Sequence, residues 1–363
     1  MAFPIFGKLK AVDKILSAFV GPVKIEVRKC VRQRNKRADC NNCSTVCPVS
    51  AVSVDSGGIR VDSDKCVKCG RCANVCKTGV FSFSGFSESA YCNALTSGSA
   101  DAGYLVIACS ECGTGDDSTV TVPCLVYVGA GELLLCAASG AGKVVLRHSD
   151  CSACPKRGGG DGAAELVTAI RKIAEGFNPE IRFVVSSDKE RSSLNGKNIQ
   201  VLSRRDFFRH MTQRTKNSAI AAVNSFESVK ETGKVFRPEA AGEHTGVPLK
   251  VRMLNFALCR ILTDEMLKEP LVKKWVSVKS TEKEKCSLCG VCYKLCPTGA
   301  LAEISENAGE FRRKAGISFD KSKCTDCGIC VSVCMAGALR KDDILSAEEF
   351  RYSLRNVTEL LHI

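Results

Sequence analysis

Two closely spaced runs of cysteine between residues 286 and 334 most constrain what this chain can fold into. The first run has the sequence CSLCGVCYKLCP from Cys286 to Pro297, and the second repeats the C-x2-C-x2-C-x3-C spacing from Cys324 to Cys334. Three thiolates at this spacing converge on one cubane only if the chain wraps tightly around it. The pattern predicts two [4Fe-4S] clusters, with the fourth cysteine of each run bound to the cluster of the other run. Zinc sites would need four ligands each and no third and fourth cysteine at this spacing.

This pattern assigns a ligand set to each C-terminal cluster. We expect Gly290 and Gly328 to lie where a side chain would collide with a cluster. We also expect a short helix to start at the fourth cysteine, with Pro297 suited to its first turn. The predicted ligands are Cys286, Cys289, Cys292 and Cys334 (cysteine set 3), and Cys324, Cys327, Cys330 and Cys296 (cysteine set 4).

The N-terminal region repeats the pattern with one alteration. The run from Cys66 to Cys76 is complete, but the run that ends at Cys47 lacks a cysteine at the first position. Cys30 can fill that position if the basic segment 28–37 contains an insertion between the first and second ligands. Without Cys30, the first cluster would be a three-iron form or have a non-cysteine ligand. The predicted ligands are Cys30, Cys40, Cys43 and Cys76 (cysteine set 1), and Cys66, Cys69, Cys72 and Cys47 (cysteine set 2).

Internal repetition indicates one type of module at both ends of the chain. The segment from Ile59 to Cys66 corresponds to the segment from Ile317 to Cys324, and residues 51–54 and 59–61 flank a hairpin turn signal. Residues 30–85 and 280–340 therefore resemble bacterial-type two-cluster ferredoxins. The resemblance implies a small pseudo-symmetric fold with two [4Fe-4S] clusters in each module, four in all. Residues 86–103 are rich in Ser and Gly, which indicates a linker.

Residues 104–186 have a different pattern. Apolar strands are predicted at 104–108, 120–123, 143–146 and 181–185, and helices at 125–141 and 162–176. Strands that alternate with helices indicate a parallel sheet. The predicted fold class is therefore α+β, with two ferredoxin-like modules and a central α/β domain whose sheet is mostly parallel.

The cysteines of the central domain follow the carboxyl ends of its predicted strands. Open α/β sheets bind ligands at that edge, so Cys109, Cys112, Cys124, Cys151 and Cys154 could meet there. Their order resembles the iron-sulfur (delta) subunit of methyl-viologen-reducing hydrogenases, and the resemblance implies one further [4Fe-4S] or [2Fe-2S] cluster. We favour Cys109, Cys124, Cys151 and Cys154 as its ligands (the central cysteine set), with Cys112 as the substitute. A zinc site and a redox-active dithiol are the alternatives.

Three further segments complete the predicted organisation. Residues 1–29 form an amphipathic docking segment, and residues 187–279 form a helical connecting region. Residues 341–363 form a C-terminal helix that opens with a capping box from Ser346 to Glu349. We expect its apolar stripe to pack on the chain's own domain or to dock to another subunit. The stripe contains Phe350, Leu354, Val357, Leu360 and Leu361.

The net charge and the cysteine content limit which cellular compartment and which partners we expect. The chain has 24 cysteines, no evident signal peptide and no apolar run long enough for a membrane span, so we expect a cytoplasmic protein with metal-bound thiolates. The formal charge is +13. Because each oxidised cluster with four thiolates carries about −2, four or five clusters lower this to about +5 or +3. The basic segment 28–37 also lacks aromatic residues for stacking on bases, so we expect no nucleic-acid partner.

No catalytic motif is present in the sequence. The four histidines are scattered, and no Walker loop, G-x-S-x-G motif or strand-linked G-x-G-x-x-G motif occurs. The predicted function is that of an iron-sulfur electron-transfer subunit of an anaerobic oxidoreductase complex. Its partner would be a molybdenum or tungsten enzyme such as formate dehydrogenase, a hydrogenase or a flavoprotein. The alternatives are a thiol or disulfide reductase with its active site at the central cysteines, and a nucleic-acid-binding protein that uses the basic segment.

Overall fold

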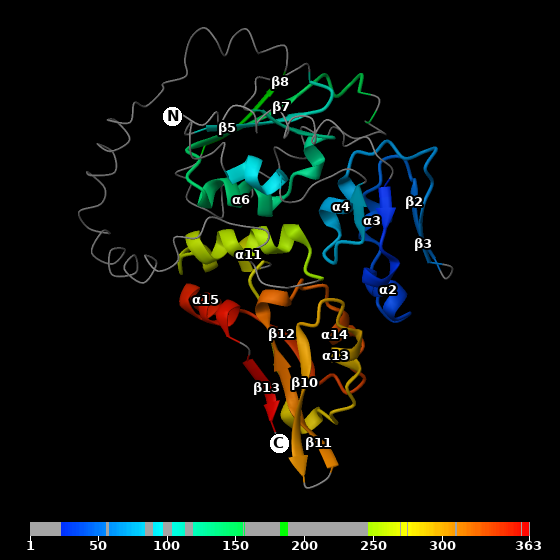
Figure 1. Ribbon diagram of the computed structural model, residues 1–363, viewed down its shortest axis with the longest axis vertical. Coiled ribbons are helices and arrows are strands. Elements are labelled where there is room, and N and C mark those ends of the chain that lie inside the picture. Colours follow the sequence, from blue (N-terminus) through cyan, green and yellow to red (C-terminus); the bar gives the residue numbers. More distant parts are fainter. Residues whose placement is uncertain are drawn as a thin grey trace, which may run out of the picture.

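A computed structural model describes most of the chain between residues 23 and 362. The described ranges are 23–55, 58–83, 90–96, 104–112, 119–154, 156, 182–187, 246–268, 270–273, 275–308, 311–356 and 358–362. The predicted docking segment before residue 23, the helix predicted at 162–176 and most of the connecting region lie outside them. Figure 1 shows three parts: a sheet with helices beneath it, an N-terminal part beside it and a C-terminal part below.

The central sheet has the parallel arrangement predicted from the sequence. Its strands are β5 (Tyr104–Cys109), β6 (Thr119–Val122), β7 (Lys143–His148) and β8 (Arg182–Ser187), in the order β6-β5-β7-β8. All three neighbouring pairs are parallel. Nearly all of β5 is buried because its residues are apolar on both faces, as expected for a strand in the middle of a parallel sheet.

Two stacked helices connect the sheet with the C-terminal part. Helix α6 (Ala130–Ala138) packs against α11 (Leu249–Ile261), and both lie below the sheet in Figure 1. Gly131 allows this close approach, because a Cβ there would lie 2.7 Å from the backbone oxygen of Lys250. The Lys250 ammonium group pairs with the buried Glu132 carboxylate and donates a hydrogen bond to the Tyr127 carbonyl oxygen at 2.6 Å. This ion pair fixes α11 against α6.

The N-terminal cysteine module comprises the described residues between 23 and 83. Strand β1 (Val23–Ile25) pairs with β4 (Phe81–Phe83), and β2 (Val52–Asp55) pairs with β3 (Gly58–Val61), both antiparallel. The second pair is the predicted hairpin. Three short helices lie between the strands: α2 (Val31–Arg34), α3 (Asn42–Thr45) and α4 (Arg71–Val75). The basic segment 28–37, predicted to contain an insertion, includes helix α2.

The C-terminal cysteine module comprises the described residues between 278 and 342 and has a matching plan. Strand β9 (Val278–Thr281) pairs with β12 (Leu339–Asp342), and β10 (Leu301–Ala308) forms a long hairpin with β11 (Phe311–Phe319). Helices α13 (Val291–Leu295) and α14 (Ile329–Ser332) each begin at the glycine that follows a C-x2-C pair. The short segments α12 (Pro270–Lys273) and a 3-10 turn at Met266–Lys268 precede this module.

Two predictions for the connecting segments were wrong. Within the predicted linker 86–103, residues 90–96 are helical, and Tyr91, Cys92 and Leu95 are completely buried. The predicted C-terminal helix is α15 (Ala347–Arg355), but it ends early and the chain continues as strand β13 (Thr358–His362), which pairs with β11. The Ser346 cap is present, since its hydroxyl accepts a hydrogen bond from the Glu349 backbone N–H at 3.0 Å. Among the described residues, no helix has the length and apolar character needed to cross a bilayer.

Candidate metal centres

The first cysteine of three predicted runs follows the same local structure. A single 3-10 turn precedes Cys30, Cys286 and Cys324, at Val27–Lys29, Lys283–Lys285 and Lys321–Lys323. The backbone of each cysteine is then extended, with φ between −71° and −82°. Cys30 therefore occupies the same structural position as Cys286, although the spacing to its next cysteine is longer. This supports its assignment as the displaced first residue of its run.

After the fourth cysteine of each run, the chain forms a tight turn. No helix starts there, so that prediction was wrong. The thiol sulfur accepts a hydrogen bond from the backbone N–H four residues on, at 3.2 to 3.4 Å. The pairs are Ala51 N–H to Cys47, Val80 N–H to Cys76, Ala300 N–H to Cys296 and Ala338 N–H to Cys334. Such hydrogen bonds stabilise a thiolate and tune the potential of a cluster bound to it.

Glycine is needed beside the C-x2-C pairs for its backbone conformation. Gly70, Gly290 and Gly328 have φ near +80° and form the N-caps of α4, α13 and α14. A Cβ at Gly290 would meet the Tyr293 hydroxyl oxygen at 2.5 Å, whereas a Cβ at Gly328 would have nothing within 4 Å. The left-handed conformation explains all three glycines. The predicted collision with a cluster is not tested.

Cysteine set 1 lines one cavity in the N-terminal cysteine module. The cavity wall contains all four predicted members of the set, Cys30, Cys40, Cys43 and Cys76. Burial, with smaller contributions from the neighbouring Cys76, Cys40 and Cys30, raises the pKa of the Cys43 thiol to about 11. The structure therefore brings these four residues together from α2, α3 and the end of α4.

Cysteine set 2 is assembled in the same module. Burial raises the pKa of Cys69, and its charged neighbours include Cys47 and Cys66. Burial also raises the pKa of Cys72 to about 12, with contributions from Cys69 and Cys66. Cys47 belongs to the first run in sequence, but in space it lies with the second run. This is the crossed arrangement that the spacing predicts.

Cysteine set 4 shows the same crossing, and three members of set 3 lie in the same apolar core. Cys296, Cys324, Cys327 and Cys330 line one cavity, which is the whole predicted set 4. In set 3, burial raises the pKa of Cys292 to about 11, and the neighbours Cys286 and Cys289 contribute. Cys334 packs on the same apolar core as Cys286. Cys289 is exposed to solvent, whereas the other described cysteines are buried or half-buried.

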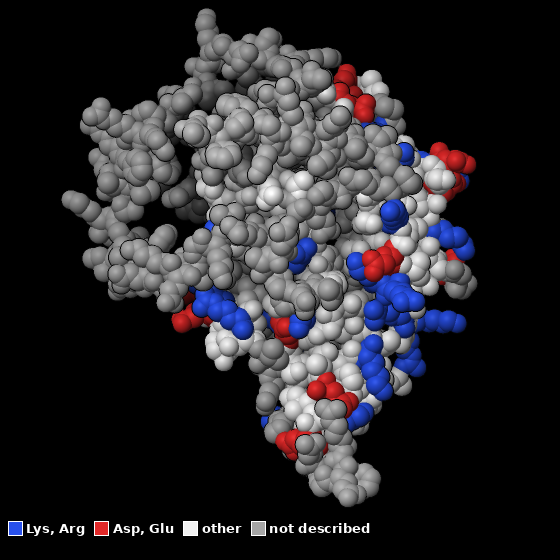
Figure 2. Space-filling view, viewed as in Figure 1, with Lys and Arg blue, Asp and Glu red and all other residues white. Residues whose placement is uncertain are grey.

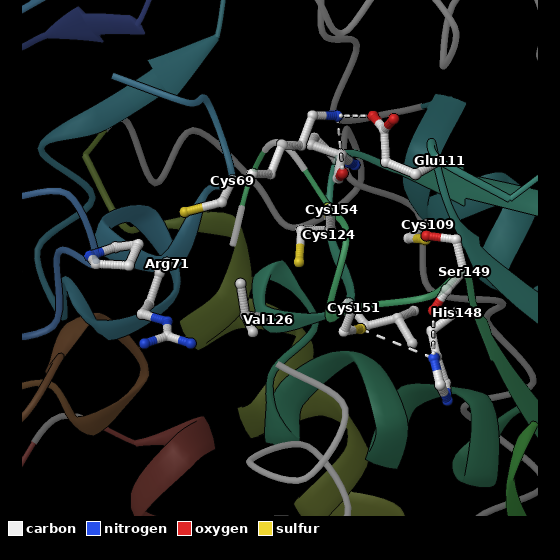
Figure 3. A pocket seen from close by; sticks show the side chains of 14 residues that line it. Cys69, Arg71, Cys109, Glu111, Cys124, Val126, His148, Ser149, Cys151 and Cys154 are labelled. Carbon is white, nitrogen blue, oxygen red and sulfur yellow. Dashed lines mark hydrogen bonds and ion pairs between the residues drawn. The ribbon is translucent and has the colours of Figure 1, made fainter. Parts of the chain in front are cut away.

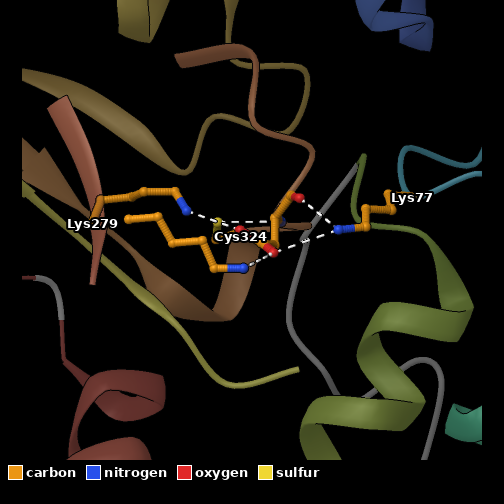
Figure 4. A network of polar contacts seen from close by, with 5 residues as sticks. Lys77, Lys279 and Cys324 are labelled. Atoms are coloured by element: carbon orange, nitrogen blue, oxygen red, sulfur yellow. Dashed lines mark hydrogen bonds and ion pairs between the residues drawn. The ribbon is translucent and has the colours of Figure 1, made fainter. Parts of the chain in front are cut away.

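A group of charged residues surrounds set 4. The Asp326 carboxylate lies 2.9 Å from the ammonium nitrogen of Lys279, 2.7 Å from that of Lys341 and 3.5 Å from that of Lys77. Burial opposes the charge of Asp326, but Lys279 and Lys341 outweigh it and hold the pKa of the carboxyl group well below its usual range. Figure 4 shows Lys77 and Lys279 reaching this carboxylate from opposite sides, next to Cys324.

Two buried lysines thus lie beside the thiols of set 4, in addition to apolar residues such as Leu301 and Phe319. Lys279 and Lys321 are 4% and 2% exposed. Burial disfavours the charge of Lys279, yet nearby Cys324 and Asp326 raise its pKa. Burial lowers the pKa of Lys321, and Cys324 and Asp326 oppose that change. Positive charges at this place would stabilise the anionic thiolates of a bound cluster.

The central cysteines converge at the carboxyl edge of the sheet, as predicted. One pocket is lined by the four favoured residues, Cys109, Cys124, Cys151 and Cys154, together with Cys69 of set 2. Figure 3 shows Cys69 and Arg71 on one side of this pocket and Cys109, Ser149 and His148 on the other. Burial, with smaller contributions from Cys69, Cys109 and Cys154, raises the pKa of Cys124 to about 11. The pocket thus lies between the central sheet and the N-terminal cysteine module.

Cys112 does not line that pocket. Its sulfur lies 3.5 Å from the sulfur of Cys109 and 3.3 Å from the Arg147 carbonyl oxygen. The hydrogen bond from Cys112 lowers the pKa of Cys109 to about 5, against the effect of burial, and the Ser149 backbone adds to the decrease. A thiol with so low a pKa is a thiolate at neutral pH, which is the form that binds metals and reacts.

Sequence analysis missed several residues at these centres. Lys279 and Asp326 had no motif, and neither did Lys156, which pairs with Glu111 at 2.8 Å at the edge of the central pocket. Arg71 and His148 also line that pocket, and the His148 Nδ1 lies 3.7 Å from the Cys151 sulfur. Contacts across the fold reveal Lys279 and Lys156, whereas His148 lies only three residues from Cys151 and was interpreted from the sequence as a surface loop residue.

Within the described residues, no three Cys, His, Asp or Glu side chains are close enough together to hold a single metal ion. This finding concerns one ion only. A cubane of four irons is much larger than one ion, so its ligand sulfurs lie farther apart.

Comparison with known proteins identifies the cysteine modules. A family described as "4Fe-4S dicluster domain" matches residues 36–80 and again residues 285–338. The protein named "Putative oxidoreductase UacF" from Escherichia coli (strain K12) is 46% identical over 43 residues, which cover 11% of this chain and 7% of that protein. No solved structure is significantly similar to the chain. The chain thus contains two 4Fe-4S dicluster domains, and the first match leaves Cys30 outside its limits.

Proposed function

We propose that this protein is an electron-transfer subunit that carries single electrons through four [4Fe-4S] clusters and a fifth iron-sulfur centre. The observation that carries the proposal is the grouping of the cysteines. Sets 1 and 4 and the central set each line one cavity with all four of their predicted members. The two dicluster matches support the same chemistry at residues 36–80 and 285–338.

The chain's residues would perform three tasks for the clusters. The four cysteines of each set would hold the irons. The backbone N–H groups of Ala51, Val80, Ala300 and Ala338 would donate to the sulfurs and favour the reduced state. Burial would exclude water, which lowers the reorganisation that accompanies each electron transfer. A bound cluster supplies the one-electron oxidation and reduction itself.

We further propose that the protein works within a cytoplasmic, anaerobic multi-subunit complex. A partner with molybdenum, tungsten, hydrogenase or flavin chemistry would catalyse the reaction. This proposal rests on the large share of cysteines that the cluster sets use and on the absence of a catalytic motif in the sequence. Co-purification from an anaerobic extract would identify the partner subunits.

Metal analysis of anaerobically purified protein tests the main proposal. Five cubanes require about 20 irons per chain, and four cubanes with a two-iron centre require about 18. We expect one of these values, with matching sulfide and EPR signals after graded reduction. About 16 irons with one zinc would exclude a central cluster, and fewer than about 16 irons would contradict the four ferredoxin-type clusters.

One observation favours a second candidate, a dithiol reductase at the central pocket. The 3.5 Å distance between the Cys109 and Cys112 sulfurs suits a thiolate and a thiol that close into a disulfide, with two electrons passed to a substrate and one proton released. Electrons from set 2 would reopen it. The two candidates differ in a simple test on the reduced, iron-loaded protein: iodoacetamide would alkylate Cys109 if it belongs to a dithiol, whereas a cluster that uses Cys109 as a ligand would protect it.

A further inference from the structure

The segment between Cys30 and Cys40 lies between the two cysteine modules. Val31 of helix α2 and Ala38 are buried in a small apolar core with Ile329 and Val333 of the C-terminal cysteine module. In Figure 1, α2 extends from the N-terminal module toward α14 and α13. The insertion that distinguishes this run from the others is therefore the part that packs on the second module.

Polar contacts join the same two surfaces. The Arg34 guanidinium group donates to the Leu295 carbonyl oxygen at 3.5 Å, and Arg37 contacts the sulfur of Met335. Beside them, the Lys77 ammonium group donates to the Asp326 carbonyl oxygen at 2.9 Å. Figure 2 shows Lys and Arg side chains gathered along this side of the molecule. The basic segment thus binds a carbonyl oxygen and a thioether sulfur of its own chain, and Lys77, outside that segment, binds Asp326.

This packing brings two cysteine sets together. The cavity lined by set 1 is also lined by Cys327, a member of set 4. On the other side of the N-terminal module, Cys69 of set 2 lines the pocket of the central cysteine set. Inside each module, the crossed fourth cysteine keeps the two sets adjacent. At the far end of the series, Cys289 of set 3 is exposed.

From this arrangement we infer that the centres form one unbranched series, in the order set 3, set 4, set 1, set 2 and central set, with the crossing between the modules at Cys327. Electron tunnelling weakens steeply with distance, so the contact between neighbouring sets decides the path. The insertion between Cys30 and Cys40 holds that crossing together. The exposed end at Cys289 and the central pocket are the two places where electrons enter and leave.

This inference rests on the proposed function, and the experiment separates the two. The anaerobically purified full chain is reduced, and the spin–spin interaction between reduced clusters is measured by EPR beside the iron and sulfide content. Too few irons in the unaltered protein would contradict the proposed function. A full iron content with no interaction between the modules would overturn the inference alone.

Variants at the junction provide the sharper test. Ala38→Asp places a charge in the apolar core between the modules, and we expect the cross-module interaction to be lost while the iron content is retained. Lys36→Asp, at an exposed position of the same insertion, is the matched control and should keep the interaction. Lys77→Ala removes the contact with Asp326 without burying a charge and should weaken the interaction. An unchanged spectrum in both Ala38→Asp and Lys77→Ala would overturn the inference, and Lys77→Ala decides the matter if Ala38→Asp does not fold.

Ligand variants test the order. Cys330→Ser should remove the set 4 cluster and abolish all interaction between the modules, while the interaction between sets 1 and 2 remains. Cys289→Ser should remove only the set 3 cluster and leave the cross-module interaction intact. The opposite pattern, in which Cys289→Ser abolishes that interaction and Cys330→Ser preserves it, would contradict the order.

Discussion

The two cysteine modules share a backbone plan but differ in the charge around equivalent positions. Counted from the matching cysteines, Lys279 and Lys341 of the paired strands β9 and β12 correspond to Val23 and Phe83 of β1 and β4. Lys321 corresponds to Ser63 in the same way. The C-terminal module thus places buried lysines beside set 4, where the N-terminal module has apolar or hydroxyl side chains beside set 2.

This difference predicts that clusters bound in the two modules have unequal reduction potentials. Reduction adds negative charge to a cluster, so nearby lysines favour the reduced state. Asp326 offsets part of this effect, since it pairs with three lysines. The equivalent position in the N-terminal module is Lys68, which has the same positive φ. Lys68 and Asp326 narrow the difference, but at the compared positions three lysines and one aspartate leave a net charge of +2 beside set 4, against +1 beside set 2. We therefore expect set 4 to have a higher potential than set 2.

The largest expected effect concerns the one ligand whose spacing differs between the modules. Cys30→Ser should remove one cluster, about four irons per chain, or convert it to a three-iron form with about one iron fewer. The reason is that Cys30 follows the same 3-10 turn as Cys286 and Cys324. Iron and sulfide analysis with EPR measures the loss. Cys259→Ser, outside every set, is the control, and an unchanged iron content in Cys30→Ser would refute the equivalence.

The next effect concerns charge. Lys279→Met removes a positive charge beside set 4, and the potential of one cluster should become more negative. A unit charge about 8 Å from the cluster, at an effective dielectric constant of about 20, contributes about 2 kcal/mol per electron. Potentiometric titration followed by EPR measures the shift. Val23→Met, at the equivalent strand position, should leave all potentials nearly unchanged, and an equal shift in both variants would disprove the role of the lysine.

The smallest effect concerns the turn after the fourth cysteine. Gly79, Gly299 and Gly337 have φ of 60° to 66° there, whereas the first N-terminal run has Ser50 at φ 50°. Because a non-glycine residue in this conformation costs about 1 to 2 kcal/mol, Ser50→Gly should raise the free energy of unfolding by up to that amount, less the entropy cost of glycine in the unfolded chain. Chemical denaturation under anaerobic conditions measures it. A lower stability would show that the Ser50 side chain makes a compensating contact.

The sequence patterns predicted the local features well. Cysteine spacing indicated which residues come together, and apolar runs located all four strands of the parallel sheet. The failures have a common physical cause, which is competition from distant parts of the chain. The stripe from Phe350 to Leu361 has helical spacing, but pairing with β11 converts its end into a strand. Tyr91, Cys92 and Leu95 are too few to stand out in a Ser- and Gly-rich stretch, yet the core buries them.

The charged surroundings of set 4 could not be predicted for the same reason. Lys77 and Asp326 are 249 residues apart in sequence and meet only because the modules pack together. The basic segment illustrates the limit further. Nothing in its composition indicated a contact within the chain, whereas Arg34 donates to the Leu295 carbonyl oxygen and Arg37 contacts the Met335 sulfur of the C-terminal module.

The position of helix α2 has a consequence for how the protein matures. The helix lies between Cys30 and Cys40, two residues that would bind the same cluster, so iron would fix both ends of the segment that joins the modules. Closing this loop removes conformational entropy before docking, and metal binding and folding become thermodynamically linked. Cluster insertion in the N-terminal module would therefore precede and promote assembly of the two halves, and a chain that lost this cluster would come apart at its centre.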